Sequence, residues 1–109
     1  MLSAKMLEIP MTILRVGFLR RLTWLRIFTN TTPTRLARIM YTAKRKELPV
    51  IVFMIHSSEL MVGKSPYVTT EAELQHLYDC LESFFALCAG EHISGITASA
   101  FSRGFSRAA

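Results

Sequence analysis

The chain has 109 residues, half of them hydrophobic, and a mean hydropathy of +0.30. This length allows one small domain. No apolar run approaches the ~20 residues of a membrane-spanning helix. Charge is uneven: residues 1–46 hold ten Lys/Arg against Glu8 alone, whereas residues 47–109 hold three Lys/Arg against seven acids. A basic half is usually a solvated surface, and less often a contact for nucleic acid or anionic lipid.

The first half of the chain predicts one strand and one helix. Residues 7–13 alternate apolar and polar side chains, which predicts a strand, and Pro10 places it at a sheet edge. Residues 16–28 mix apolar residues with arginines and predict either a short basic amphipathic helix or an irregular loop. Thr32 as the N-cap and proline in the first turn predict a helix over 33–47.

The middle of the chain predicts a second strand and the longest helix. The apolar, β-branched run at 50–55 predicts a strand buried on both faces. A loop should follow at 56–69. Thr70 and Glu73 match a capping box, which predicts a helix over 70–89.

The last segment contains two free thiols and a short helix. Cys80 and Cys88 are too far apart along one helix to form a disulfide, and we expect both to be reduced core residues. Gly90 is placed to end that helix, and an extended piece at 92–95 should precede a helix at 97–105. No signal-peptide pattern is visible, which favours a cytoplasmic location.

The alternation of strands and helices predicts an α/β fold with parallel strands. Two strands cannot form a parallel sheet that is buried on both faces. We therefore expect residues 1–109 to be a single incomplete domain that belongs to a larger α/β protein. The 50–55 strand should run parallel to the 7–13 strand, and faces meant for missing strands should promote self-association.

His56 is the main candidate for chemistry, because it ends the apolar run, where α/β and barrel enzymes place catalytic groups. Three interpretations remain open: a general acid or base, a metal ligand paired with Glu59, or a structural histidine. No third ligand is evident. His76 and His92 are expected to be exposed and inert.

The residues after His56 could assist it. Ser57 or Ser58 could act as a nucleophile, but the glycine-flanked elbow that exposes such a serine is missing, so loop shaping is favoured. Glu59 could orient His56, bind substrate or be a solvated loop acid. Trp24 and Tyr67 could stack on sugar rings, although packing is the more common role of lone aromatics.

Residues 53–67 read Phe-Met-Ile-His-Ser-Ser-Glu-Leu-Met-Val-Gly-Lys-Ser-Pro-Tyr. This block resembles the final conserved motif of the polysaccharide deacetylases, the NodB-like enzymes of carbohydrate esterase family 4. The extended form, with a Thr-Glu-opened helix after it, is similar to one bacterial subgroup. Leu-Glu-Ile-Pro-Met-Thr-Ile at 7–13 and Leu-Thr-Trp-Leu-Arg at 22–26 are similar to it too, so the resemblance covers about residues 7–102.

The resemblance implies a partial (β/α) barrel, namely the last two to three βα units of a distorted TIM barrel. It implies hydrolysis of N-acyl groups on polysaccharides or other glycans, a carbon–nitrogen hydrolase activity, with zinc or another divalent metal in the full-length family. His56 takes the place of the general acid. We expect Ser57, Ser58 and Glu59 to help bind substrate, and we assign no metal ligand or cofactor to this chain.

The family's Asp-Asp and His-x-x-x-His motifs, which supply its base and metal ligands, do not occur in this sequence. Val62 and Lys64 also replace the more turn-like residues of the subgroup. We therefore expect a truncated carboxyl-terminal fragment that is inactive alone. Two alternatives are a small basic protein that binds anionic lipid or nucleic acid through Arg15–Arg26, and a regulatory fragment that pairs with a full-length deacetylase.

Overall fold

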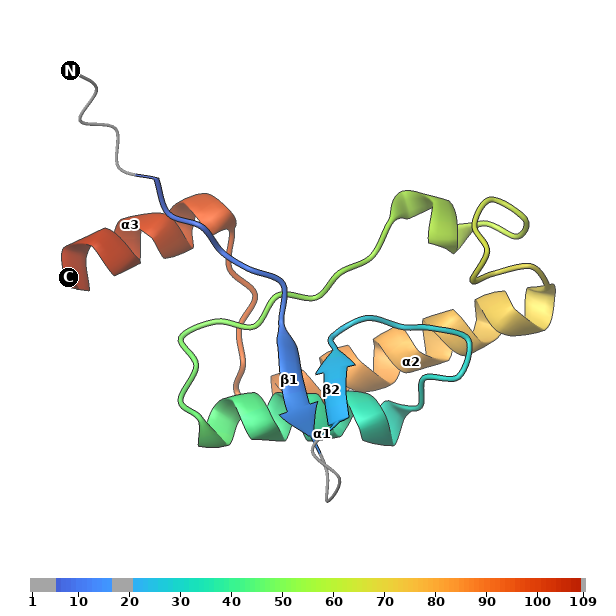
Figure 1. Cartoon of the computed structure of the whole chain (residues 1–109), viewed down its shortest axis with the longest axis horizontal. Helices are drawn as coiled ribbons and strands as arrows, with labels where there is room; N and C mark the ends of the chain where they lie inside the picture. The colour runs from blue at the N-terminus through green and yellow to red at the C-terminus, as the bar shows by residue number, and fades with distance from the viewer. Residues whose placement is uncertain (1–5, 17–20, 109) are drawn as a thin grey trace.

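The computed structural model describes residues 6–16 and 21–108, with side chains through residue 104. It is a small α/β domain (Figure 1). The elements in chain order are β1 (Ile13–Val16), β2 (Arg21–Trp24), α1 (Pro33–Arg45), the short 3-10 helix η1 (Ser57–Leu60), α2 (Glu71–Gly90) and α3 (Ala98–Ala108). Among the described residues, no helix is both long and apolar enough to cross a membrane.

Helix α1 is central to the packing, because it contacts both β1 and α2. Figure 1 shows the β1–β2 hairpin lying across α1, with α3 away from it, beside the extended residues that precede β1. One hydrophobic core joins the segment after β2, α1, the loop before α2, and α2. Its buried members are Leu25, Ile27, Leu36, Ile39, Met40, Val68, Leu77, Cys80, Phe84 and Cys88.

The two helices with clear sequence caps form where they were predicted. Thr32 accepts a hydrogen bond from the Arg35 backbone N–H (3.2 Å), and α1 begins at Pro33. Thr70 accepts from the Glu73 N–H (3.1 Å) at the start of α2. The Glu73 carboxylate returns to the Thr69 N–H (3.1 Å) rather than to that of Thr70, so the reciprocal bond lies one residue earlier than in a standard capping box.

Each of the two long helices is followed by a residue in the left-handed conformation that is not glycine. Glu47 (φ 54°) follows α1 and His92 (φ 59°) follows α2. After each, the next N–H bonds back into the last turn, from Leu48 to the Ala43 carbonyl (3.1 Å) and from Ile93 to the Cys88 carbonyl (2.8 Å). This is the Schellman arrangement. We expected Gly90 to follow the helix and adopt the left-handed conformation that closes it. Gly90 is instead the last residue of α2, and His92 adopts the left-handed conformation.

The expected strands are wrong in their bounds. The 7–13 strand is observed only from Ile13, and its partner is Arg21–Trp24 in an antiparallel hairpin. Within the segment 16–28, Arg21–Trp24 therefore form a strand rather than a helix, and residues 25–28 continue from it without a helical turn. The hairpin joins residues close in sequence, so little chain entropy is lost when its loop closes. Residues 17–20 lie outside the described residues.

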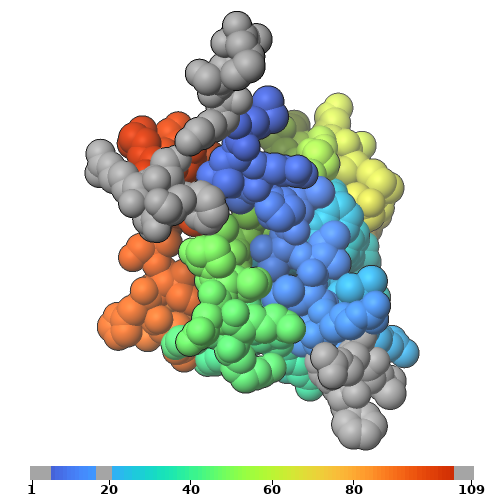
Figure 2. Space-filling model, turned by 60° about the vertical axis from the view of Figure 1, so that its left-hand side comes forward, coloured from blue at the N-terminus to red at the C-terminus, as the bar shows by residue number. Residues whose placement is uncertain are grey.

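The predicted buried strand at 50–55 is extended backbone with one parallel bridge, between Met54 and Arg26. Its side chains are half-buried rather than buried on both faces. Thr12 also holds this segment: its N–H donates to the Val52 carbonyl (3.3 Å), and its hydroxyl accepts from the Val52 N–H (2.7 Å). Figure 2 shows the blue amino-terminal segment against the green middle of the chain. No β-ladder between 7–13 and 50–55 is present among the described residues, because only these isolated bonds join them.

The carboxyl-terminal part follows the prediction more closely. Cys80 and Cys88 are both free and buried in the core. Residues 93–97 have no regular structure, so the extended piece at 92–95 is not a strand. Thr97 accepts a hydrogen bond from the Ala100 N–H (3.1 Å), and α3 runs on to Ala108, beyond the predicted end. The barrel stays a prediction, as does the incomplete domain.

Candidate active site

The chain after β2 presents two different faces. Leu25 and Ile27 are buried in the hydrophobic core. Trp24, Arg26 and Phe28 alternate with them and therefore share the opposite side of the extended chain. The segment thus places an arginine between two aromatic rings, on the side away from the core.

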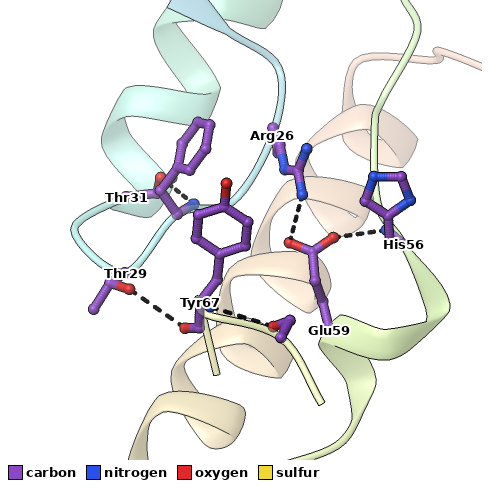
Figure 3. A network of polar contacts seen from close by, with 8 residues as sticks. Arg26, Thr29, Thr31, His56, Glu59 and Tyr67 are labelled. Atoms are coloured by element: carbon purple, nitrogen blue, oxygen red, sulfur yellow. Dashed lines mark hydrogen bonds and ion pairs between the residues drawn. The ribbon is translucent and has the colours of Figure 1, made fainter. Parts of the chain in front are cut away.

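The parallel bridge between Arg26 and Met54 brings this arginine to His56. The Met54 N–H donates to the Leu25 carbonyl at 3.1 Å, which aligns the two extended segments. Residue 56 lies two positions beyond Met54, so it continues along the same side of the chain. Residues far apart in the sequence therefore meet at one place (Figure 3).

Glu59 connects the two segments. Its Oε1 lies 3.1 Å from Arg26 Nη2, and its Oε2 accepts a hydrogen bond from the His56 backbone N–H at 2.6 Å. In the other direction, the Glu59 N–H donates to the His56 carbonyl (3.0 Å), which closes the first turn of η1. Figure 3 shows the carboxylate between Arg26 and His56. Both bonds to residue 56 use its backbone, so the imidazole is left exposed.

The Arg26–Glu59 ion pair is buried: the side chains are 7% and 2% exposed. A buried ion pair is tolerated only when further contacts replace the lost hydration. Here the Arg26 guanidinium carbon lies 5.3 Å from the centre of the Trp24 ring, 5.5 Å from Phe28 and 5.0 Å from Tyr67. Each distance is within the range of a cation–π interaction. We call these three rings the aromatic cage.

The loop that carries Tyr67 is fixed to the hairpin side. Tyr67 packs edge-on against Phe28, with ring centres 5.5 Å apart, and its carbonyl accepts from the Thr29 hydroxyl at 3.3 Å. Thr31 in turn accepts from the Phe28 N–H at 2.8 Å (Figure 3). The cage is thus assembled from the segment after β2 and from the loop before α2.

The structure clarifies the roles left open for the residues after His56. Glu59 is not a solvated acid, because both its oxygens are engaged and buried; it orients the His56 backbone. Ser57 and Ser58 are exposed on the first turn of η1, next to the imidazole-bearing residue. They are therefore accessible to a ligand, whereas Glu59 acts from beneath the turn.

If His56 and Glu59 were metal ligands, further ligand side chains would have to lie beside them, and the described part of the chain offers none. There, no three His, Cys, Asp or Glu side chains are grouped as a metal site. The Glu59 carboxylate is already committed to Arg26 and to the His56 backbone. The described residues therefore do not fit a bound metal ion by themselves.

Two residues differ from their sequence interpretation. His76 was expected to be exposed and inert, but it is half-buried, with its Nε2 2.7 Å from the Thr31 carbonyl and 3.6 Å from Cys80 Sγ. Burial raises the pKa of Cys80, with the Asp79 charge adding to the shift, so its thiol is not activated. Arg26 was grouped with a surface that binds polyanions, but it is buried and paired with Glu59.

Sequence reasoning missed Arg26 as part of the site. The signal was the alternation Trp24, Arg26, Phe28, which places one cation between two aromatics on one side of a strand. No protein-family model matches this chain, and neither a curated protein nor a solved structure matches it.

Proposed function

We propose that this chain is the general-acid segment of a polysaccharide deacetylase-like protein, with His56 as the proton donor. The observation that supports the proposal is the Arg26–Glu59–His56 arrangement, in which a buried ion pair fixes the backbone of an exposed histidine. A catalytic group must be held in position by its surroundings while its reactive atoms stay accessible. The resemblance of residues 53–67 to the family motif points to the same histidine.

The chemistry requires this role. When the amide of an N-acyl sugar is hydrolysed, the amine is a poor leaving group unless it is protonated as the carbon–nitrogen bond breaks. An imidazole that titrates near neutral pH can give this proton. We expect Ser57 and Ser58, which are exposed on the same turn, to contact the sugar. Glu59 acts as a positioning residue through the His56 backbone.

No metal-dependent step is derived from this chain, because its described residues do not supply a ligand set. In the family, a divalent metal activates the water that attacks the amide. The corresponding motifs are not in this sequence. The purified chain is therefore expected neither to bind zinc tightly nor to release acetate from N-acetylated oligosaccharides.

The test is a chimera in which this chain replaces the corresponding segment of an active deacetylase. His56→Ala should lower kcat by about 10²–10⁴-fold, the usual contribution of a general acid, while the bound metal content stays unchanged. His92→Asn is the control, because His92 is exposed, follows α2 and tolerates asparagine in its left-handed conformation.

Two outcomes would contradict the proposal. If His56→Ala left turnover intact, the histidine would be structural. If it instead removed the metal, the histidine would be a ligand. A chimera with the general acid removed should also lose the decline in kcat at high pH, since that decline reports the deprotonation of the acid.

A further inference from the structure

A second feature, which shares Arg26 with the His56 site, is a pocket of about 510 Å³ between the hairpin and α1. Its wall is formed on one side by β2 and the residues after it, and on the other by the first turns of α1. The lining residues are Val16, Arg21, Leu22, Thr23, Trp24, Arg26, Phe28, Thr31, Arg35, Leu36, Arg38 and Ile39.

The charge of this pocket has one sign. Four of its lining residues are arginines, and among the described residues that line it none is acidic. Arg21, Arg35 and Arg38 form no ion pair within the described part of the chain, where the two salt bridges are Arg26–Glu59 and Lys44–Glu91. Positive charges gathered around a concave surface raise its affinity for an anion.

A separate observation shows what the ligand must offer. Trp24 Nε1 and Arg26 Nε are buried N–H donors without a hydrogen-bond partner among the described residues, and both side chains line the pocket. An unsatisfied buried donor costs about 1–3 kcal/mol. Because an indole N–H and a guanidinium N–H can only donate, a ligand that satisfies them must carry hydrogen-bond acceptors, such as the oxygens of an anion.

The N–H donors of Arg26 therefore differ in their partners. Its Nη2 is paired with Glu59, and its side chain is only 7% exposed. Its Nε remains unpaired. Arginine presents its donors in a planar fork that suits the oxygens of a phosphate or carboxylate. One anionic group in the pocket could accept from Arg26 Nε and Trp24 Nε1 while Arg38 and Arg35 balance its charge.

We propose that this pocket binds the phosphate group of a small phosphorylated molecule. A dianionic phosphate monoester matches the excess of arginines better than a single carboxylate does. The pocket is larger than a phosphate ion alone, and its apolar lining, Leu22, Leu36 and Ile39, leaves room for the rest of a ligand. The buried donors lie within a concavity, which a small molecule enters more readily than a continuous nucleic-acid backbone. This proposal does not depend on the deacetylase assignment.

The test uses the full chain, with inorganic phosphate and glucose 6-phosphate as probes at constant ionic strength. Trp24 is the only tryptophan, so its fluorescence reports on the pocket directly. We expect saturable binding of one equivalent, with glucose inert and acetate weaker than phosphate. Calorimetry on the same samples gives the affinity without relying on the fluorophore.

Two variants of α1 form a matched pair. Arg38→Gln removes a pocket arginine, whereas Arg45→Gln removes the same charge from the last turn, outside the pocket. Arg38→Gln should weaken phosphate binding by about tenfold, the equivalent of one charge-assisted hydrogen bond. Arg45→Gln should leave it within about twofold, the contribution of a distant screened charge. Trp24→Phe, measured by calorimetry, should also weaken binding because it removes the Nε1 donor.

Other results would overturn the proposal. The absence of binding at millimolar phosphate would show that the donors serve no anion. Equal losses in Arg38→Gln and Arg45→Gln, with an affinity that falls steeply with salt, would show unspecific attraction of anions to the basic surface. Tighter binding of an oligonucleotide or of anionic vesicles, insensitive to Arg38→Gln, would assign the charge to a polyanion instead.

Discussion

Two ion pairs connect distant segments of this chain, and they lie in opposite surroundings. Arg26–Glu59 joins the end of β2 to η1 and is buried, with side chains 7% and 2% exposed. Lys44–Glu91 joins α1 to the end of α2 at 2.7 Å and is open to water, with side chains 53% and 30% exposed. Tyr41 donates a further hydrogen bond to Glu91 at 2.9 Å.

The difference shows that a short distance alone says little about the importance of an ion pair. Water screens the exposed pair, so little free energy depends on it. The buried pair has lost its water and relies on the aromatic cage and on the His56 N–H instead. We therefore expect the fold, and the position of His56, to be sensitive to the buried pair only.

The largest effect should come from breaking the buried pair on one side. Glu59→Ala leaves the Arg26 charge without a partner and the His56 N–H without an acceptor, which should lower the free energy of unfolding by about 3–5 kcal/mol. Urea unfolding followed by Trp24 fluorescence measures this. Ser57→Ala, on the exposed side of the same turn, should change it by less than about 0.5 kcal/mol. A loss from Glu59→Ala no larger than this control would show that the pair is dispensable.

The double variant Arg26→Met/Glu59→Leu tests the same point from the other direction. Removing both charges eliminates the uncompensated ion, and methionine fits among aromatic rings. The double variant should therefore be more stable than Glu59→Ala alone. A double variant as unstable as the single one would mean that the carboxylate's bond to His56, rather than the charge pairing, carries the stabilisation.

A smaller effect should come from the turn beside the exposed pair. His92 adopts a left-handed conformation (φ 59°) directly after Glu91, and glycine is free of the steric cost of that conformation. His92→Gly should raise the free energy of unfolding by about 0.5–1 kcal/mol, because it removes the steric cost of the left-handed conformation. Gly90→Ala serves as the comparison. Gly90 is helical and a Cβ there would meet no other atom, so this substitution should not destabilise the fold. Destabilisation by His92→Gly would indicate that the charge interaction of His92 with Glu91 outweighs the relieved backbone strain.

The smallest effect should come from the exposed Lys44–Glu91 ion pair when the pH is lowered. The hydrogen bond from Lys44, followed by that from Tyr41, lowers the pKa of Glu91 below its usual 4.5. A carboxylate with a lowered folded-state pKa stabilises the fold above its usual pKa, and this contribution is lost as the pH falls through the lowered value. Lys44→Met should therefore shift the Glu91 titration, followed by carboxylate NMR, back toward the usual value while stability at neutral pH hardly changes.

The control for this titration is Glu73, at the opposite end of α2. Hydrogen bonds from Thr69 lower the pKa of Glu73 as well, but Lys44 takes no part in them. Its titration should therefore be the same in Lys44→Met and in the unchanged chain. A shift of both carboxylates would point to a change in the whole fold rather than in the ion pair.

The sequence by itself determined the long helices and singled out His56 as the candidate residue. Thr32 with Pro33, and Thr70 with Glu73, act on backbone groups only a few positions away, so their patterns locate α1 and α2 without knowledge of the rest of the fold. His56 was identified because an apolar segment ends there. Local signals are legible in a sequence since their partners are close along the chain.

Only the tertiary structure decided the hairpin register and the burial of Arg26 and Glu59. Whether an arginine is a surface cation or a buried partner depends on which distant segment lies beside it, and here that is the Met54 bridge. The same holds for the 50–55 segment, whose apolar pattern suits a buried strand but whose neighbours in this chain cover it only in part. Burial and charge pairing are properties of the assembled neighbours, and composition and periodicity do not specify which neighbours meet.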